Sequence, residues 1–283
     1  MKLTISKLMV LSVALLAGFT TILGKPLYDG KENFIESLNH KFSNPSSRIV
    51  NGIRVQEGER PFQVSLIRRG RFTCGGSLIG PRYVLTAAHC VHESPASQFQ
   101  VHYGTLQYGT GPNASVDQVH AHPGYTANGV RDDIAVLRLS VPVAPSTPNI
   151  AFALINRFQA LLKKGEVVTV SGWGRTARNQ TVSEHLLQAG LKIVDFDECA
   201  QRWSGAFRLS LGMICAADED SSACHGDSGS PLTLDSINSG NSSYLQIGIV
   251  SVGAPTCYSN KLPNVYTDVY HYRNWIRNIV RRG

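Results

Sequence analysis

Three short stretches of the sequence carry side chains that together can perform nucleophilic catalysis. His89 lies in TAAHC, Asp133 in DDIAVL and Ser228 in GDSGSP. A serine hydroxyl is a weak nucleophile near neutral pH, so it needs a base that accepts its proton and a carboxylate that orients this base. We therefore predict that Ser228 attacks a carbonyl carbon, that His89 acts as its base and that Asp133 orients His89.

The glycines around the serine provide a second feature of such a site. They leave room for a substrate carbonyl, and we predict that the N–H groups of Gly226 and Ser228 stabilise the oxyanion that forms there. Each stretch by itself has an ordinary explanation, as a packed histidine, a capping acid or a glycine turn. The three stretches in this order favour catalysis.

The region that must position these residues has the pattern of an all-β protein. Short runs of alternating or β-branched residues predict strands at 62–66, 83–85, 167–170, 245–249 and 265–269. Clusters of Gly, Pro and Asn separate these runs and predict turns. Because the 235 residues from 49 to 283 are many for one pair of sheets, we expect two β units.

Residues 270–282 predict an amphipathic helix at the C-terminus. Arginines recur every fourth residue along one of its faces, at Arg273, Arg277 and Arg281, while apolar residues form a stripe on another face. The arginines form either a solvated face or a surface that binds anions.

The N-terminal segment predicts export. Residues 1–24 begin with Lys2 and Lys7 and continue as an uncharged stretch, which is typical of a secretory signal peptide. The stretch is short for a spanning helix of about 20 residues, although a membrane anchor is the alternative. Residues 25–48 are polar and predict an exposed, protease-sensitive linker. We expect a secreted, extracellular protein.

The cysteines and sequons agree with export. The six cysteines are Cys74, Cys90, Cys199, Cys215, Cys224 and Cys257. An even number predicts three disulfides, although many pairings are open, and the absence of a C-x-x-C pair argues against a zinc site. Sequons at Asn113, Asn179 and Asn241 predict glycosylation.

The charge is modest. The formal net charge is +7, and residues 1–48 alone hold six basic and three acidic residues. The remaining chain is mildly basic, so we expect no nucleic-acid partner.

The stretches TAAHC, DDIAVL and GDSGSP, in this order, resemble the chymotrypsin-fold, trypsin-like family of secreted serine endopeptidases, and within it the chymotrypsin-like subgroup. Three further motifs share this resemblance: RIVNG at 48–52, CGGSLI at 74–79 and SGWG at 171–174. The resemblance covers residues 49–283, which it marks as the peptidase domain. It implies two six-stranded antiparallel β-barrels packed face to face with a C-terminal helix, and a catalytic cleft between the barrels. It also implies a monomer that hydrolyses protein or peptide substrates through an acyl-enzyme, needs no cofactor, and is a target of protein protease inhibitors.

The resemblance implies roles for further residues. Ser251 would support the triad aspartate. The disulfides would be Cys74–Cys90, Cys199–Cys215 and Cys224–Cys257. Residues 25–48 would be an activation propeptide that an Arg-specific peptidase cuts after Arg48, and the new ammonium group of Ile49 would pair with Asp227.

The specificity pocket departs from that of family members that cut after Arg or Lys. Ser222 occupies its base, where those members carry aspartate, and Gly253 leaves the entrance open. Asn264 replaces the usual glycine and makes the floor shallower and more polar. We expect a chymotrypsin-like or broad apolar preference for the residue before the cut bond. The loop after His89 lacks the paired acids of the family's calcium loop, so no metal is expected.

Two alternative functions stay open. A catalytically silent, protease-like binding protein would normally lack a triad residue, and none is missing here. A peptidase with an additional role in binding anionic surfaces would use the C-terminal arginines.

Overall fold

The computed structural model describes residues 49–282, apart from 128–129, 145, 157–161, 178–179, 239–240 and 258–261, and apart from the side chains of 236–238 and 241–242. The predicted signal peptide at 1–24, the propeptide at 25–48 with Arg48, and the sequon at Asn179 lie outside the described residues.

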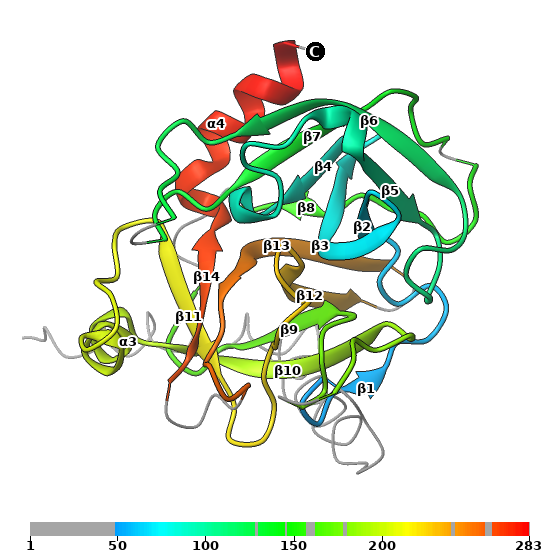
Figure 1. Ribbon diagram of the computed structural model, residues 1–283. Helices are drawn as coiled ribbons and strands as arrows, with labels where there is room; N and C mark the ends of the chain where they lie inside the picture. The colour runs from blue at the N-terminus through cyan, green and yellow to red at the C-terminus, as the bar shows by residue number, and fades with distance from the viewer. Residues whose placement is uncertain are drawn as a thin grey trace, which may run out of the picture. The chain divides into compact units, whose positions relative to one another are not determined.

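The first half of the described chain forms a closed antiparallel barrel (Figure 1). Its strands are β2 (Gln63–Arg68), β3 (Arg71–Gly80), β4 (Tyr83–Thr86), β5 (Phe99–Tyr103), β6 (Asn113–Ala121) and β7 (Ala135–Leu139). They follow the order β2-β3-β4-β7-β6-β5, and β5 pairs again with β2. Alternate residues such as Val64, Leu66 and Val101 fill the barrel interior because successive side chains of a strand point to opposite faces.

The second half forms another closed barrel of six strands. These are β9 (Val167–Gly172), β10 (Leu187–Val194), β11 (Met213–Ala217), β12 (Pro231–Asn238), β13 (Asn241–Val252) and β14 (Asn264–Asp268). Their order is β10-β11-β14-β13-β12-β9, and the pairing of β9 with β10 closes the ring. Two short strands join from outside, β1 (Ile53–Arg54) beside β10 and β8 (Leu154–Ile155) parallel to β13. The predicted two-barrel fold is therefore confirmed.

The helical elements lie outside the barrels. Within the described residues they are the 3₁₀ turns η1 (Ala88–Cys90) and η2 (Ala96–Gln98) and the helices α3 (Phe196–Trp203) and α4 (Val269–Arg282). Helix α3 was not predicted, and the Asp195 carboxylate caps its N-terminus by accepting from the N–H groups of Asp197 and Glu198. Helix α4 follows the last strand of the second barrel but buries Tyr272 and Ile276 in the core of the first.

The seam between the two barrels is polar. Ser171 Oγ of β9 donates to Gln63 Oε1 of β2 across 2.7 Å, and Gln63 Nε2 lies 3.4 Å from Ser230 Oγ. Ser77 Oγ of β3 donates to Gln246 Oε1 of β13 across 2.6 Å. These buried groups satisfy one another, so the barrels are held in one specific alignment.

Candidate active site

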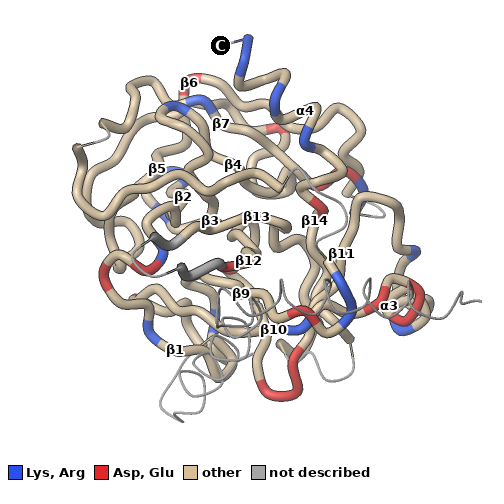
Figure 2. The backbone as a smooth tube through the Cα atoms, turned by 180° about the vertical axis from the view of Figure 1, so that it is seen from behind, with Lys and Arg blue, Asp and Glu red and all other residues tan. Residues whose placement is uncertain are grey.

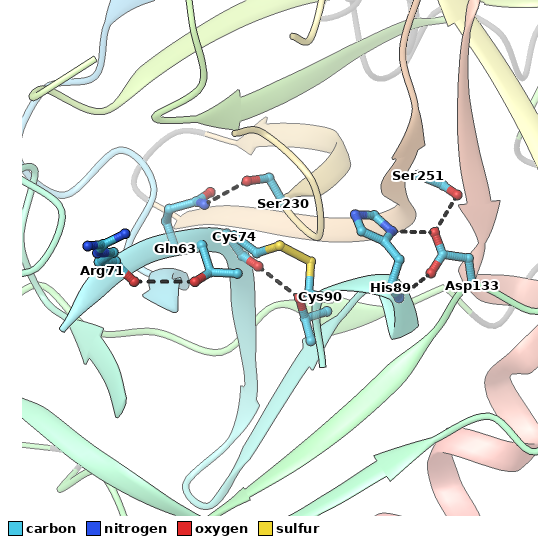
Figure 3. Close-up of a disulfide and its surroundings, with 11 residues drawn as sticks. Gln63, Arg71, Cys74, His89, Cys90, Asp133, Ser230 and Ser251 are labelled. Carbon is cyan, nitrogen blue, oxygen red and sulfur yellow. Dashed lines mark hydrogen bonds and ion pairs between the residues drawn. A yellow bond between two sulfur atoms is a disulfide. The ribbon is translucent and has the colours of Figure 1, made fainter. Parts of the chain in front are cut away.

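His89 lies in the turn η1, directly after β4. Its neighbour Cys90 forms a disulfide with Cys74 of β3, which ties this turn to the barrel wall (Figure 3). The flanking Ala88 and Cys90 are buried, whereas the imidazole of His89 is 31 % exposed. The backbone is thus fixed while the ring is open to a substrate.

Asp133 precedes β7 and presents a buried carboxylate to His89. Its Oδ2 lies 2.8 Å from His89 Nδ1, and its Oδ1 accepts from the His89 backbone N–H across 2.9 Å. Because the carboxylate can only accept, the proton of the neutral imidazole lies on Nδ1, and Nε2 is left as a base. Figure 3 shows the two side chains aligned in this way.

The second barrel fixes the other side of Asp133. Ser251 Oγ of β13 donates to Asp133 Oδ2 across 2.6 Å, and Thr267 Oγ1 of β14 donates to its backbone carbonyl across 2.7 Å. Burial by itself would raise the pKa of the Asp133 carboxyl, but hydrogen bonds from His89 and Ser251 and the charge of His89 outweigh burial and lower the pKa. The carboxylate therefore stays ionised near neutral pH.

The adjacent Asp132 points elsewhere. Its Oδ1 accepts from the phenol of Tyr272 on α4 across 2.6 Å, and its φ of 53° lies in the left-handed region. The turn directs the two neighbouring carboxylates to different partners. It is Asp133, and not Asp132, whose carboxylate meets the imidazole.

Ser228 lies in the turn before β12. Its carbonyl accepts from Gly75 N–H across 2.9 Å, and a Cβ at Gly229 would collide with Thr86 Oγ1 and the Gly75 carbonyl. These contacts pack the serine turn against the end of β4, three residues before His89. Among the described contacts, no hydrogen bond joins the Ser228 hydroxyl to His89.

Two backbone donors lie free beside this serine. Gly226 has a φ of 99°, a conformation that favours glycine. Within the described part of the chain, neither the N–H of Gly226 nor that of Ser228 has a hydrogen-bond acceptor, although both residues are partly buried. Two such donors can bind one substrate oxygen that becomes negatively charged.

Asp227 occupies a closed niche behind the serine turn. Its carboxylate is fully buried and accepts from the N–H groups of Gly174 and Cys224 at 2.7 and 2.9 Å. Burial raises its pKa to about 6 in spite of these two donors. Ile49 is also fully buried, and Val50 pairs with Ser222 as an antiparallel bridge, so residues 49–50 lie against the segment that carries Asp227.

The side chains expected to form the specificity pocket contact one another. Ser222 and Asn264 are fully buried, and Ser222 Oγ lies 2.7 Å from Asn264 Oδ1. Asn264 Nδ2 donates to the Ala223 carbonyl across 3.0 Å and lies close to the position that a Cβ at Gly253 would occupy. The asparagine amide therefore crosses the space next to Gly253.

The remaining predicted residues are placed as follows. The disulfides are Cys74–Cys90, Cys199–Cys215 and Cys224–Cys257, the pairs that the resemblance implies. Asn113 is exposed at the start of β6, and Asn241 begins β13. A cluster of possible metal ligands in the described region, Cys74, His89 and Cys90, contains two sulfurs that are already joined in a disulfide.

Some supporting contacts were not anticipated from the sequence. Thr267 and Tyr272 hold the two neighbouring aspartates, but both lie more than a hundred residues away along the chain. No local motif marks them, because their role depends on how β14 and α4 return to the first barrel.

Comparison with known proteins decides the family. The family model described as Trypsin matches residues 49–276. The chain belongs to the trypsin family. Trypsin alpha of Drosophila erecta is 36 % identical over 232 residues, which are 81 % of this chain and 86 % of the relative. Kallikrein-15 of Homo sapiens is 35 % identical over 267 residues, which are 87 % of this chain and 98 % of the relative.

This trypsin-family protein is a serine endopeptidase, as the sequence motifs predicted. Its substrates are proteins or peptides. No helix among the described residues is long and apolar enough to cross a membrane.

Proposed function

We propose that this endopeptidase hydrolyses peptide bonds through an acyl-enzyme, with Ser228 as nucleophile, His89 as general base and Asp133 as the residue that orients His89. The observation that carries the proposal is the buried Asp133 carboxylate, which meets His89 Nδ1 and is held by Ser251 of the other barrel. This arrangement leaves Nε2 of His89 unprotonated and able to accept a proton. A catalytically silent protein would not need it.

The chemistry follows from these positions. His89 Nε2 accepts the Ser228 proton as the oxygen attacks the carbonyl, and the imidazolium that forms is stabilised by the Asp133 carboxylate. The carbonyl oxygen becomes negative and accepts from the free N–H groups of Gly226 and Ser228. His89 then protonates the leaving amine. A water molecule, activated by the same base, releases the acyl group from Ser228.

For specificity, we infer a preference for apolar residues of moderate size, such as Leu or Met, before the cut bond. The relative from Drosophila erecta is named a trypsin, but the base of the proposed pocket carries Ser222 and Asn264, which are both neutral and joined by a hydrogen bond. An arginine side chain would lose its hydration there without gaining a counter-charge, which costs several kcal/mol. The amide of Asn264 also occupies depth that a large aromatic ring would need.

For regulation, we infer a secreted zymogen that is activated by a cut after Arg48. Burial raises the pKa of Asp227 to about 6, and among the described contacts the carboxyl has no cationic partner. A cut would turn the buried Ile49 nitrogen into an ammonium group beside the segment that bears Asp227. Since the pocket disfavours arginine, another, Arg-specific peptidase would have to make the cut.

The experiment starts from purified zymogen that is free of other peptidases. Incubation with a trace of its own mature form should leave it intact, whereas a trace of an Arg-specific peptidase should create an N-terminus at Ile49. Titration with a serine-acylating reagent should then label one site per chain, and Ser228→Ala should abolish the labelling. Absence of labelling in the cleaved wild type would favour the silent binding protein, and rapid self-cleavage would contradict the inferred pocket.

A further inference from the structure

A hollow of about 400 Å³ lies between the outer face of the first barrel and helix α4. This volume falls within the range of small-ligand pockets, about 300–1,000 Å³. On the barrel side, Tyr83 of β4 and Gln118 of β6 are both cross-strand partners of Arg138 on β7. The three side chains thus form one row across three strands, and His120 continues it along β6.

The helix side of the hollow consists of residues on one face of α4. Trp275, Asn278, Ile279 and Arg282 line it at the spacing i, i+3, i+4 and i+7. The indole of Trp275 and the side chain of Ile279 are partly buried, whereas Asn278 and Arg282 are exposed. One wall of the hollow therefore combines an aromatic surface with an amide and a cation.

The floor contains an unsatisfied hydroxyl. Tyr83 is 7 % exposed, and its buried phenol oxygen has no hydrogen-bond partner among the residues that the structure describes. Leaving a buried polar group unpaired is costly, and such a group calls for a partner that the protein itself does not provide. Tyr83 lines the hollow, but this oxygen is closed to solvent, so Tyr83 contributes its ring and not its hydroxyl to the surface of the hollow.

The charges around the hollow are mainly positive. Arg138 uses Nε and one terminal nitrogen to bind Asp117, at 2.9 and 3.0 Å, so that both carboxylate oxygens are occupied. Arg282 has no ion-pair partner in the described part of the chain. Burial and the nearby Arg138 lower the pKa of His120, which is therefore neutral near pH 7. Figure 2 shows that basic residues recur along α4 and on the neighbouring part of the first barrel.

We propose that this hollow binds a sulfated sugar unit of an anionic polysaccharide. Arg282 presents a free guanidinium group to the oxygens of a sulfate group, and Arg138 adds Nη1, the nitrogen that Asp117 does not occupy. The amides of Gln118 and Asn278 can exchange hydrogen bonds with sugar hydroxyls, and Trp275 offers a flat apolar surface to the sugar ring.

The same lining disfavours a membrane surface as the partner. The exposed large apolar side chains among the described residues are Val141, Leu154, Phe196 and Leu211, and none of them lines the hollow. A membrane-binding face would need such side chains to enter the lipid. The site does not include His89, Asp133 or Ser228, so binding is separable from peptidase activity.

Calorimetric titration of the full chain with a heparin hexasaccharide at low salt tests the proposal. The hexasaccharide should bind at least about tenfold more tightly than its desulfated form or inorganic sulfate. Arg282→Gln should weaken binding about tenfold, and Arg138→Gln, whose guanidinium is shared with Asp117, about threefold. Arg277→Gln is the matched control, because Arg277 is an exposed arginine of the same helix that does not line the hollow.

The comparison between arginines decides the outcome. Less than a twofold effect of Arg277→Gln, with unchanged hydrolysis of a short peptide in all variants after activation, supports a defined site. An equal loss of affinity for Arg277→Gln and Arg282→Gln would show that the hexasaccharide is held by non-specific electrostatic attraction to the helix, and it would overturn the proposal. Binding to vesicles with 20 % phosphatidylserine but not to the hexasaccharide would overturn it as well.

Discussion

Ser222 and Asn264 face each other across 2.7 Å at the base of the proposed specificity pocket, and the serine hydroxyl donates to the amide oxygen. The amide nitrogen of Asn264 is occupied by the Ala223 carbonyl, 3.0 Å away. The polar groups of this floor are therefore satisfied before any substrate enters. Such a floor offers no charge to a basic side chain of the substrate and little room to a large one. A change of Asn264 tests the second of these properties.

Asn264→Gly should open the pocket. Removing the side chain frees the space beside Gly253, so kcat/KM for peptides with Phe or Tyr before the cut bond should rise at least about tenfold. Peptides with Ala at that position fill little of the pocket and should change less than about threefold. Peptide-cleavage kinetics measure both. A uniform change for all peptides would mean that Asn264 affects the catalytic residues and not the pocket.

Asp133→Asn should lower kcat by at least about a hundredfold, because the asparagine amide no longer fixes Nδ1–H or stabilises the imidazolium. Asp132→Asn is the matched control, since its amide oxygen still accepts from Tyr272 and its side chain does not touch His89. It should reduce kcat by less than about threefold. Steady-state kinetics on one peptide compare the two variants. A larger loss for Asp132→Asn than for Asp133→Asn would show that Asp132, and not Asp133, orients His89.

The charge of Asp227 should make the uncleaved chain less stable as the pH rises. The unfolded carboxyl loses its proton near the usual pKa of 3.8, but the folded one holds it up to about pH 6. Since the folded state binds more protons within this window, the free energy of unfolding falls as the pH rises from 4 to 7. The loss amounts to about 3 kcal/mol at 1.36 kcal/mol per pKa unit.

Urea unfolding of the uncleaved Ser228→Ala chain at pH 4 and 7 measures this loss against Asp227→Asn in the same background. The asparagine variant should lack the Asp227 contribution because it cannot ionise. After cleavage at Arg48, the pH-dependent difference between the two chains should shrink or reverse, since an ammonium partner favours the ionised acid. If the difference in the free energy of unfolding between the two uncleaved chains did not change with pH, the folded chain would already pair the Asp227 carboxylate with a cation.

Gly75→Ala should strain the seam between the barrels. A Cβ at this position would collide with Ser230 Oγ, and overpacking of this kind costs about 1–3 kcal/mol. Because Gly75 N–H also holds the Ser228 carbonyl, activity should fall together with stability. Ser230→Gly removes the colliding oxygen and should restore most of both in the double variant. Equal losses in the single and double variants, measured by urea unfolding and kinetics, would show that another contact carries the strain.

The sequence was most informative where a role depends on neighbouring residues in the chain. The stretches around His89, Asp133 and Ser228 specify turns and strand ends directly, and the alternating or β-branched runs predict five of the twelve barrel strands, namely β2, β4, β9, β13 and β14. Helix α3 was missed although Asp195 is a good cap, because its eight residues lie in a polar segment. Contacts such as Thr267 with Asp133 depend on the docking of whole strands, and only coordinates reveal them.

The polar seam between the two barrels determines when the enzyme becomes active during refolding and when it loses activity during unfolding. His89 and Asp133 belong to the first barrel, whereas Ser228 and the hydroxyl of Ser251 come from the second. In the proposed mechanism neither barrel supplies all the groups that take part, so the rate of catalysis depends on the alignment of the two barrels more than on the stability of either one. Turnover should be the last property to emerge during refolding and the first to disappear under mild denaturant, while both barrels still keep their strands.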